Sequence, residues 1–291
     1  MESFPECKAC ILGTAGRIAG LCKADDRLRG KVLREGAQVL DSLDQRLSPA
    51  ELSHHVFMSA YQNLGHDDPF AAEKRNQNAA ALELRAMLRG KIAQALDPLH
   101  MAVKLSVAGN IIDLGAQVSF DMMEGIQRAV EFDFTINDYA DLRGQLGQTR
   151  HLLYILDNAG EIVFDALLLE VIERQFPVES ITLVVRRRPM LNDVTIHDAK
   201  QLGLTERYDV IDSGSDVFGL PWAHASADFK RRFMAADTVI AKGMANFETL
   251  DNAPRDVFFI LMAKCQPISR HLQVSHKDLI LKHHKAMPSL G

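Results

Sequence analysis

Long apolar segments are missing from this sequence. No hydrophobic run approaches the ~20 residues that a membrane-spanning helix requires. The first ten residues, MESFPECKAC, also lack the basic region and apolar core of a signal peptide. We therefore expect a soluble, cytoplasmic protein with no membrane partner.

Cysteines and clusters of basic residues are few. The four cysteines in 291 residues do not make a disulfide framework and indicate a reducing compartment. Lysine and arginine do not gather into one block and the net charge is −5, which argues against nucleic acid as a partner. Cys7 and Cys10 form a lone CxxC, which favours a structural role or none. A metal or redox role would require Cys22, Cys265 or a histidine close in space.

Hydrophobic residues make up 47% of the chain, enough for a sizeable core, and in the N-terminal half they follow helical spacing. Ser48, Pro49 and Glu51 supply an N-cap, a first-position proline and a capping-box glutamate. Leucine and isoleucine at four-residue spacing predict another helix over about 72–97. We expect an all-helical domain over residues 1–140 that contributes to an active-site cleft.

A further helix is predicted over 103–116, where the sequence GNIIDLGA occurs. Asn110 and Asp113 lie three residues apart in it and therefore share one face. A polar pair inside an otherwise apolar helix must be satisfied by a partner.

The pattern changes after residue 150 to short apolar runs that alternate with helix-length segments. This alternation is typical of a mainly parallel sheet covered by helices on both faces, a Rossmann-like αβα sandwich over residues 141–291. The apolar runs lie at 152–156, 181–185, 208–211, 238–241 and 257–263.

Polar residues follow the first two of these runs. Asp157 and Asn158 come directly after the first run, and Asp193 follows the second. The carboxyl ends of parallel strands meet at one edge of the sheet, and carboxylate and amide oxygens suit Mg²⁺ or Mn²⁺. With no histidine or cysteine nearby, zinc is disfavoured. The alternative is helix capping, by Asn158 with Glu161 in a capping box or by Asn192 or Asp193.

Two further strand ends carry candidate ligands for a phosphate. Lys242 and Gly243 follow the fourth run, where an ammonium group beside exposed backbone amides can bind an anion. Alternatively, Lys242 pairs with Asp237 or Glu248 at the rim of the sheet. Ser213, in the segment DSGSD, either lines the same site or belongs to a turn.

One phosphatase mechanism is disfavoured by the residue after Asn158. Enzymes that form an aspartyl-phosphate commonly use a second aspartate two residues after the first, and here that position is Ala159. A metal-activated water is then the better candidate nucleophile.

Together, these segments resemble the damage-control phosphatase family, formerly domain of unknown function 89, and in particular its shorter prokaryotic-type subfamily with an N-terminal CxxC. The resemblance implies a helical N-terminal part, an αβα sandwich and metal-dependent hydrolysis of small phosphometabolites. The matching segments, in chain order, are ECKAC, HDDPF with Asn76 and Asn78, GNIIDLGA, LDNAGEIVFD, RRRPMLNDVTIHDA, DSGSD, AKGMANFETL and AKCQPI.

The resemblance also implies roles for single residues. Asp157, Asn158 and Asp193 match the metal ligands and Lys242 the phosphate-binding lysine. The motifs that line the active site contain Asn110, Asp113, Asn246 and Glu248. Met244, Ala245 and Arg188 depart from the expected pattern, which puts the substrate preference in doubt.

The expected function is therefore that of a phosphatase that uses Mg²⁺, Mn²⁺, Co²⁺ or Ni²⁺ on a sugar phosphate or a damaged cofactor phosphate. One alternative is an S-adenosylmethionine-dependent carboxyl methyltransferase, although the first strand is not followed by a glycine-rich GxGxG loop. The other is a non-catalytic metabolite-binding protein. The sequence does not indicate the oligomeric state.

Overall fold

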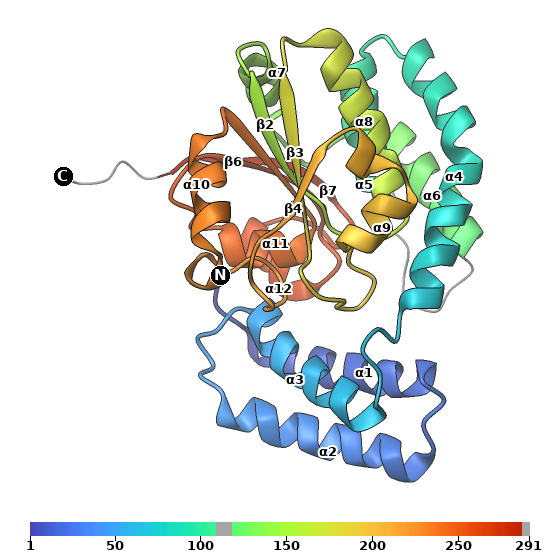
Figure 1. The fold of residues 1–291 in the computed structure, drawn as a ribbon, viewed down its shortest axis with the longest axis vertical. Helices are drawn as coiled ribbons and strands as arrows, with labels where there is room; N and C mark the ends of the chain where they lie inside the picture. Colours follow the sequence, from blue (N-terminus) through green and yellow to red (C-terminus); the bar gives the residue numbers. More distant parts are fainter. Residues whose placement is uncertain (109–117, 287–291) are drawn as a thin grey trace, which may run out of the picture.

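The computed structural model describes residues 1–108 and 118–286. It shows a three-layer αβα sandwich with a group of three helices set across one end of the sheet (Figure 1). The predicted fold class is confirmed.

The three N-terminal helices pack around a core of their own. They are α1 (Pro5–Leu21), α2 (Asp26–Ser42) and α3 (Pro49–Leu64). The N-terminus of α3 is capped as predicted, because the Glu51 N–H donates to Ser48 Oγ at 3.2 Å and the Ser48 N–H donates to Glu51 Oε2 at 3.0 Å. Buried residues of all three helices form one hydrophobic cluster, separate from the clusters on the sheet.

The sheet has seven strands in the order β1-β7-β6-β5-β2-β3-β4. The β6–β7 pair is antiparallel and the other neighbouring pairs are parallel. The strands are β1 (Ile136–Asn137), β2 (His151–Ile155), β3 (Ser180–Val185), β4 (Asp209–Asp212), β5 (Thr238–Lys242), β6 (Val257–Met262) and β7 (Leu279–His284).

The five predicted strands correspond to β2 through β6, and two strands were not predicted. The first, β1, is only two residues long. The second, β7, has the sequence LILKHH, whose polar second half does not read as a buried strand. His283 in β7 stacks on Phe258 of β6 with ring centroids 4.1 Å apart. Packing between the two strands therefore stabilises β7, although half of its own sequence is polar.

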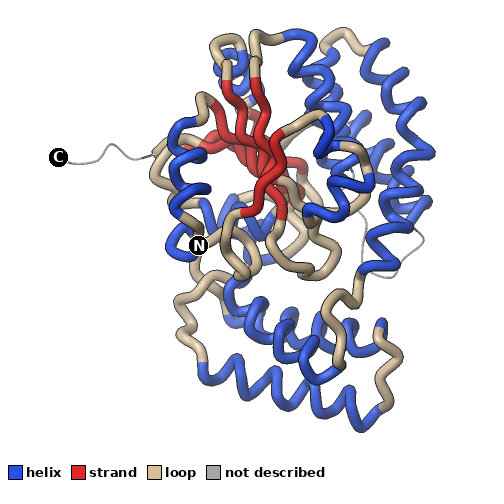
Figure 2. Tube along the Cα trace, viewed as in Figure 1, coloured by secondary structure: helices blue, strands red, loops and turns tan. Residues whose placement is uncertain are grey.

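Alternation along each strand separates two cores. Leu152 and Tyr154 of β2 belong to the cluster on one face, whereas Leu153 and Ile155 belong to the cluster on the other. Figure 2 shows the strands enclosed between the two groups of helices. The first cluster includes residues of α4 (Ala71–Gln94), α5 (Pro98–Ala108), α6 (Val118–Glu131), α7 (Tyr139–Leu146), α8 (Glu161–Gln175) and α9 (Ile196–Gln201). The second includes residues of α10 (Ala227–Ala235), α11 (Met244–Leu250) and α12 (Gln266–Leu272).

The predicted helix over 72–97 corresponds to α4. The predicted helix over 103–116 overlaps α5, and Asn110 and Asp113 lie outside the described residues. The division at residue 140 stays a prediction; α4, α5 and α6 share their hydrophobic cluster with the sheet. In the described part of the chain, no helix is both long and apolar enough to cross a membrane.

Candidate active site

The loops that follow β2 and β3 are joined by backbone hydrogen bonds. The Val194 N–H donates to the Asp157 carbonyl and the Ala159 N–H to the Asn192 carbonyl, both at 2.8 Å. Asn158 and Asp193 face each other in an isolated β-bridge. Neighbouring strands thus bring Asp157, Asn158 and Asp193 together at the carboxyl edge of the sheet.

The capping box considered as the alternative for Asn158 and Glu161 is not formed at the helix after β2. The N-cap position of α8 is Gly160, with a φ of 76° and no side-chain cap. The Asn158 amide instead donates to Asp157 Oδ2 at 2.6 Å, and Glu161 pairs with Lys242. The Asn158 side-chain amide is therefore held by the neighbouring Asp157.

The capping role considered for Asn192 or Asp193 is also wrong. Helix α9 begins only at Ile196. Its N-terminus is closed by Thr195, whose N–H and Oγ donate to Asp198 Oδ2 at 2.8 and 2.6 Å. Asp193 is thus available for a role other than capping.

Two nearly buried carboxylates share this edge with one guanidinium group. Burial and the neighbouring Asp193 raise the pKa of Asp157 well above its ordinary value. Burial also raises the pKa of Asp193, although Arg186 acts against this shift. Arg186 Nε donates to Asp193 Oδ2 at 2.5 Å, and Arg186 Nη2 lies 3.9 Å from Asp157 Oδ1.

The donor set fits a hard divalent cation. It consists of two carboxylates and one amide, the oxygen ligands that Mg²⁺ and Mn²⁺ prefer. Among the described residues, no group of three or more His, Cys, Asp and Glu side chains is placed to hold a metal ion, so the amide of Asn158 would have to complete the set. A cation between Asp157 and Asp193 would relieve the repulsion that raises the pKa of Asp157.

Helix α4 supports both loops. Asn78 Oδ1 accepts from the Gly160 N–H at 2.7 Å, which fixes the loop after β2. Gln77 Oε1 accepts from the Asn192 amide at 3.2 Å, which fixes the loop after β3. Asn78 is in a segment that resembles the family, but the sequence alone does not indicate these partners.

Gly243 allows the start of α11 to approach Asp157. Its φ is 78°, and a Cβ added to it would lie 1.9 Å from Asp157 Oδ2. Asn246, one turn on, donates to the carbonyls of Leu156 at 3.2 Å and Lys242 at 2.7 Å. Gly243 and Asn246 thus pack behind Asp157 and hold the end of β2, while their predicted contact with phosphate stays a prediction.

We expect Gly243→Ala to damage both stability and the position of Asp157. The left-handed backbone alone costs about 1–3 kcal/mol for a residue other than glycine. For the phosphatase that the resemblance implies, displacing a site carboxylate by about 1 Å should lower phosphate release roughly 100-fold. Thermal denaturation and a phosphate-release assay would measure the two effects.

Gly144→Ala in α7 is the matched control. Its added Cβ would meet no atom of the described residues within 4 Å, and alanine inside a helix is favoured by up to about 1 kcal/mol. Unchanged activity and stability in Gly243→Ala would contradict the close approach of α11 to Asp157.

Lys242 is fully buried. Its ammonium group lies 2.6 Å from both Glu161 Oε1 and Asp165 Oδ1, and it donates to the Ser106 carbonyl at 2.8 Å. Tyr154 also donates to Asp165 Oδ1, at 2.7 Å. The partners are therefore not Asp237 or Glu248, and the predicted contact of Lys242 with phosphate stays a prediction.

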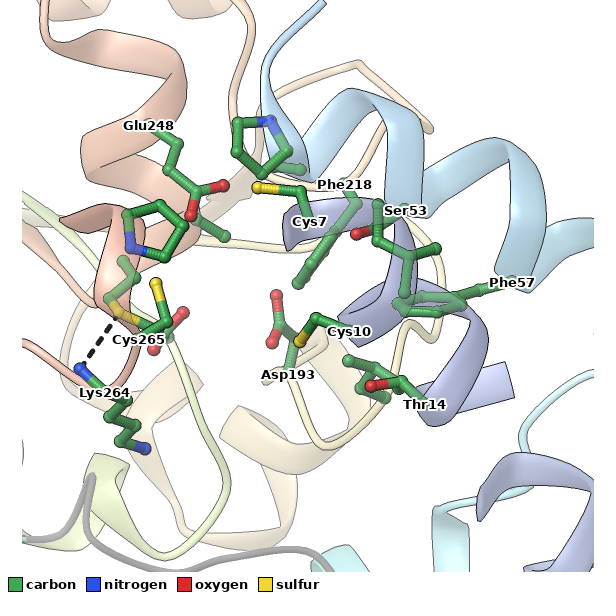
Figure 3. Close-up of a pocket in the computed structure, with 18 of the residues that line it drawn as sticks. Cys7, Cys10, Thr14, Ser53, Phe57, Asp193, Phe218, Glu248, Lys264 and Cys265 are labelled. Atoms are coloured by element: carbon green, nitrogen blue, oxygen red, sulfur yellow. Dashed lines mark hydrogen bonds between the residues drawn. The ribbon is translucent and has the colours of Figure 1, made fainter. Parts of the chain in front are cut away.

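A cavity of about 430 Å³ separates the sheet edge from α1 and α3 (Figure 3). Asp157, Asn158, Asp193 and Glu248 line it. Of the other predicted residues that the structure describes, four lie outside its lining: Ser213, Lys242, Gly243 and Asn246. Ser213 is buried and accepts from the Ser215 N–H at 3.3 Å, which is the arrangement of a turn.

Two cationic residues at the site were not among the predicted site residues. Arg186 is the first residue after β3 and Lys264 comes two residues after β6. Lys264 lines the cavity, and its charge acts to lower the pKa of Asp157. Both follow the end of a strand within two residues, as Asp157 does, so position at a strand end was the signal that could have found them.

The chain is similar over nearly its whole length to proteins of one family. The family model of the damage-control phosphatase ARMT1-like domain matches residues 3–280. The damage-control phosphatase PH1575 of Pyrococcus horikoshii is 32% identical over 284 residues, which cover 96% of this chain and 97% of that protein. A damage-control phosphatase of Archaeoglobus fulgidus is 31% identical over 289 residues, which cover 97% of this chain and 99% of that protein.

A solved structure shares the fold. The crystal structure of PH1575, described as a DUF89 family protein, matches with a TM-score of 0.88 at 32% identity and covers 98% of this chain and 100% of that chain. The similarity includes the helical part, the sheet and the edge between them.

Proposed function

The chain belongs to the ARMT1-like damage-control phosphatases, and we propose that it hydrolyses small phosphorylated metabolites at the edge that carries Asp157 and Asp193, with a divalent cation as cofactor. One observation carries this proposal. Two buried carboxylates from neighbouring strand ends line one cavity and face a single guanidinium group. Such a concentration of buried negative charge is costly unless a cation joins it.

Asp157, Asn158 and Asp193 would hold the cation. A bound divalent ion neutralises phosphoryl oxygens and lowers the pKa of water, which supplies a nucleophile at neutral pH. The protein's own part is to fix these three side chains, through the bridged loops and through Asn78 and Gln77 of α4.

Proton transfer falls to one of the two carboxylates, and charge balance falls to the residues around them. A carboxylate beside an attacking water can accept its proton, and Asp157 and Asp193 both line the cavity in which that water would lie. Lys264 lines the same cavity and offers a positive charge to the phosphate. Arg186 holds Asp193 in place.

The test is release of inorganic phosphate from sugar phosphates and cofactor phosphates in the presence of Mg²⁺, Mn²⁺, Co²⁺ or Ni²⁺. We expect turnover with at least one cation and complete loss on addition of a chelator, with recovery when the cation is restored. Activity that survives chelation would contradict the proposal. Tight, metal-independent binding of S-adenosylmethionine without phosphate release would favour the methyltransferase alternative.

A further inference from the structure

The cavity has two chemically different ends. Polar groups lie at the sheet edge, where Asp157, Asp193 and Lys264 line it. The opposite side is formed by α1, α3 and the segment before η3 (Trp222–His224), and most of its side chains are apolar. The phosphate belongs at the first end, so the second end faces the alcohol part of the ester.

An aromatic pair forms one wall of the second end. The rings of Phe57 and Phe218 have centroids 6.4 Å apart at an angle of 54°. Phe57 is buried in the core of α1, α2 and α3, and Phe218 packs against that core. The centroid of the Phe218 ring lies 5.8 Å from the guanidinium carbon of Arg186. The aromatic wall therefore lies next to the sheet edge that carries Asp157 and Asp193.

Three thiols line the same cavity, in Figure 3 around the space that Asp193 faces. Cys7 and Cys10 come from α1, and Cys265 precedes α12. Burial raises the pKa of Cys7, and it raises the pKa of Cys265 to about 12. Both thiols are therefore uncharged at neutral pH and present weakly hydrated surface.

The charged side chains on this side do not face the aromatic pair as free carboxylates. Glu6 pairs with Arg270 at 2.6 Å, and Arg17 is exposed and donates to Thr14 at 2.8 Å. Burial raises the pKa of Glu248 to about 8, which leaves this carboxyl mostly protonated at neutral pH. An unprotected sugar would bury hydroxyl groups against Phe57 and Phe218, whose rings offer no hydrogen-bond partner, and each unpaired group weakens binding.

We propose that the site prefers phosphomonoesters whose alcohol part ends in an apolar or aromatic group, and that it disfavours esters of unprotected sugars. The inference rests on the proposed function and narrows its substrate class. A cavity of about 430 Å³ holds a phosphate together with one ring and a short linker.

Three primary alkyl esters with similar leaving groups test the preference: 3-phenylpropyl phosphate, n-propyl phosphate and ribose 5-phosphate. We expect kcat/KM for the phenylpropyl ester to exceed the other two values by roughly tenfold or more, because ring burial favours binding. Equal or faster turnover of ribose 5-phosphate would overturn the inference and leave the proposed phosphatase function intact.

A binding measurement separates the two proposals. With the same cations present, calorimetry should show 3-phenylpropylphosphonate binding at least about tenfold more tightly than methylphosphonate. Tight binding without turnover of any ester would overturn the phosphatase function and support the apolar ligand. Equal affinities for the two phosphonates would overturn the apolar ligand.

The Phe218→Ala variant tests whether the aromatic wall causes the preference for an aromatic alcohol part. In this variant, the ratio of kcat/KM for the phenylpropyl ester to that for the n-propyl ester should fall at least about fivefold. Phe132→Ala is the matched control, because Phe132 is 54% exposed and lies just beyond α6. An unchanged ratio in Phe218→Ala would overturn the assignment of the wall.

Discussion

Asp157→Asn is expected to lower phosphate release roughly 10³-fold or more, because in the proposed mechanism it removes a charged ligand of the cation and a candidate proton acceptor at once. The same change should stabilise the metal-free protein. Burial and Asp193 raise the pKa of Asp157, which means that its charged form costs free energy in the folded state. An amide of the same shape avoids that cost, so Tm should rise by a few degrees.

Phosphate release and thermal denaturation, both on one preparation, check this pair of effects. The denaturation is measured in a chelator so that cation binding does not add to stability. Asp212→Asn is the matched control, since Asp212 ends β4 at the same sheet edge and is exposed. Retention of more than about a tenth of the activity in Asp157→Asn would exclude Asp157 as an essential ligand.

Lys242→Met is expected to destabilise the protein by about 3–5 kcal/mol, because it leaves two buried carboxylates without their cation. Lys242 lies 2.6 Å from both Glu161 and Asp165 and is fully buried. In a chain of this size the loss corresponds to a fall in Tm of about 10 °C. Adding Glu161→Gln and Asp165→Asn to the same chain should recover most of it.

Lys200→Met in α9 is the control for loss of a lysine. Lys200 is exposed, and a surface substitution of this kind changes stability by less than about 0.5 kcal/mol. If Lys242→Met left Tm unchanged and raised only KM, Lys242 would act on the phosphate, as the resemblance to the family implies, and not as a buried counterion.

The sequence predicted the architecture well because its signals are local. The run from Leu152 to Leu156 followed by Asp157 indicated a buried strand with a polar end, and the Ser48 cap indicated the start of α3. The strand β7 was missed because its partner β6 supplies its stability. Pairing between strands is a tertiary property that hydrophobic periodicity does not contain.

The site was only partly predictable, since the environment of a side chain depends on which face of a strand it occupies. Lys242 and Asp157 both stand at strand ends, yet one is enclosed by Glu161 and Asp165 while the other lines the cavity. The sequence shows that side chains alternate between the two faces of a strand, but it does not show which helix covers each face. The sequence also does not show that Cys7 and Cys265 line the same cavity, because more than 250 positions separate the two residues.

The separate core of α1, α2 and α3 has a consequence for the order of assembly during synthesis. These helices leave the ribosome before the strands of the sheet, and they share one hydrophobic cluster. The cavity that they face also needs Lys264 and Cys265, which follow β6 in the chain. The proposed reaction site therefore forms only after β6 has been translated, so a nascent chain that ends before β6 would lack hydrolytic activity.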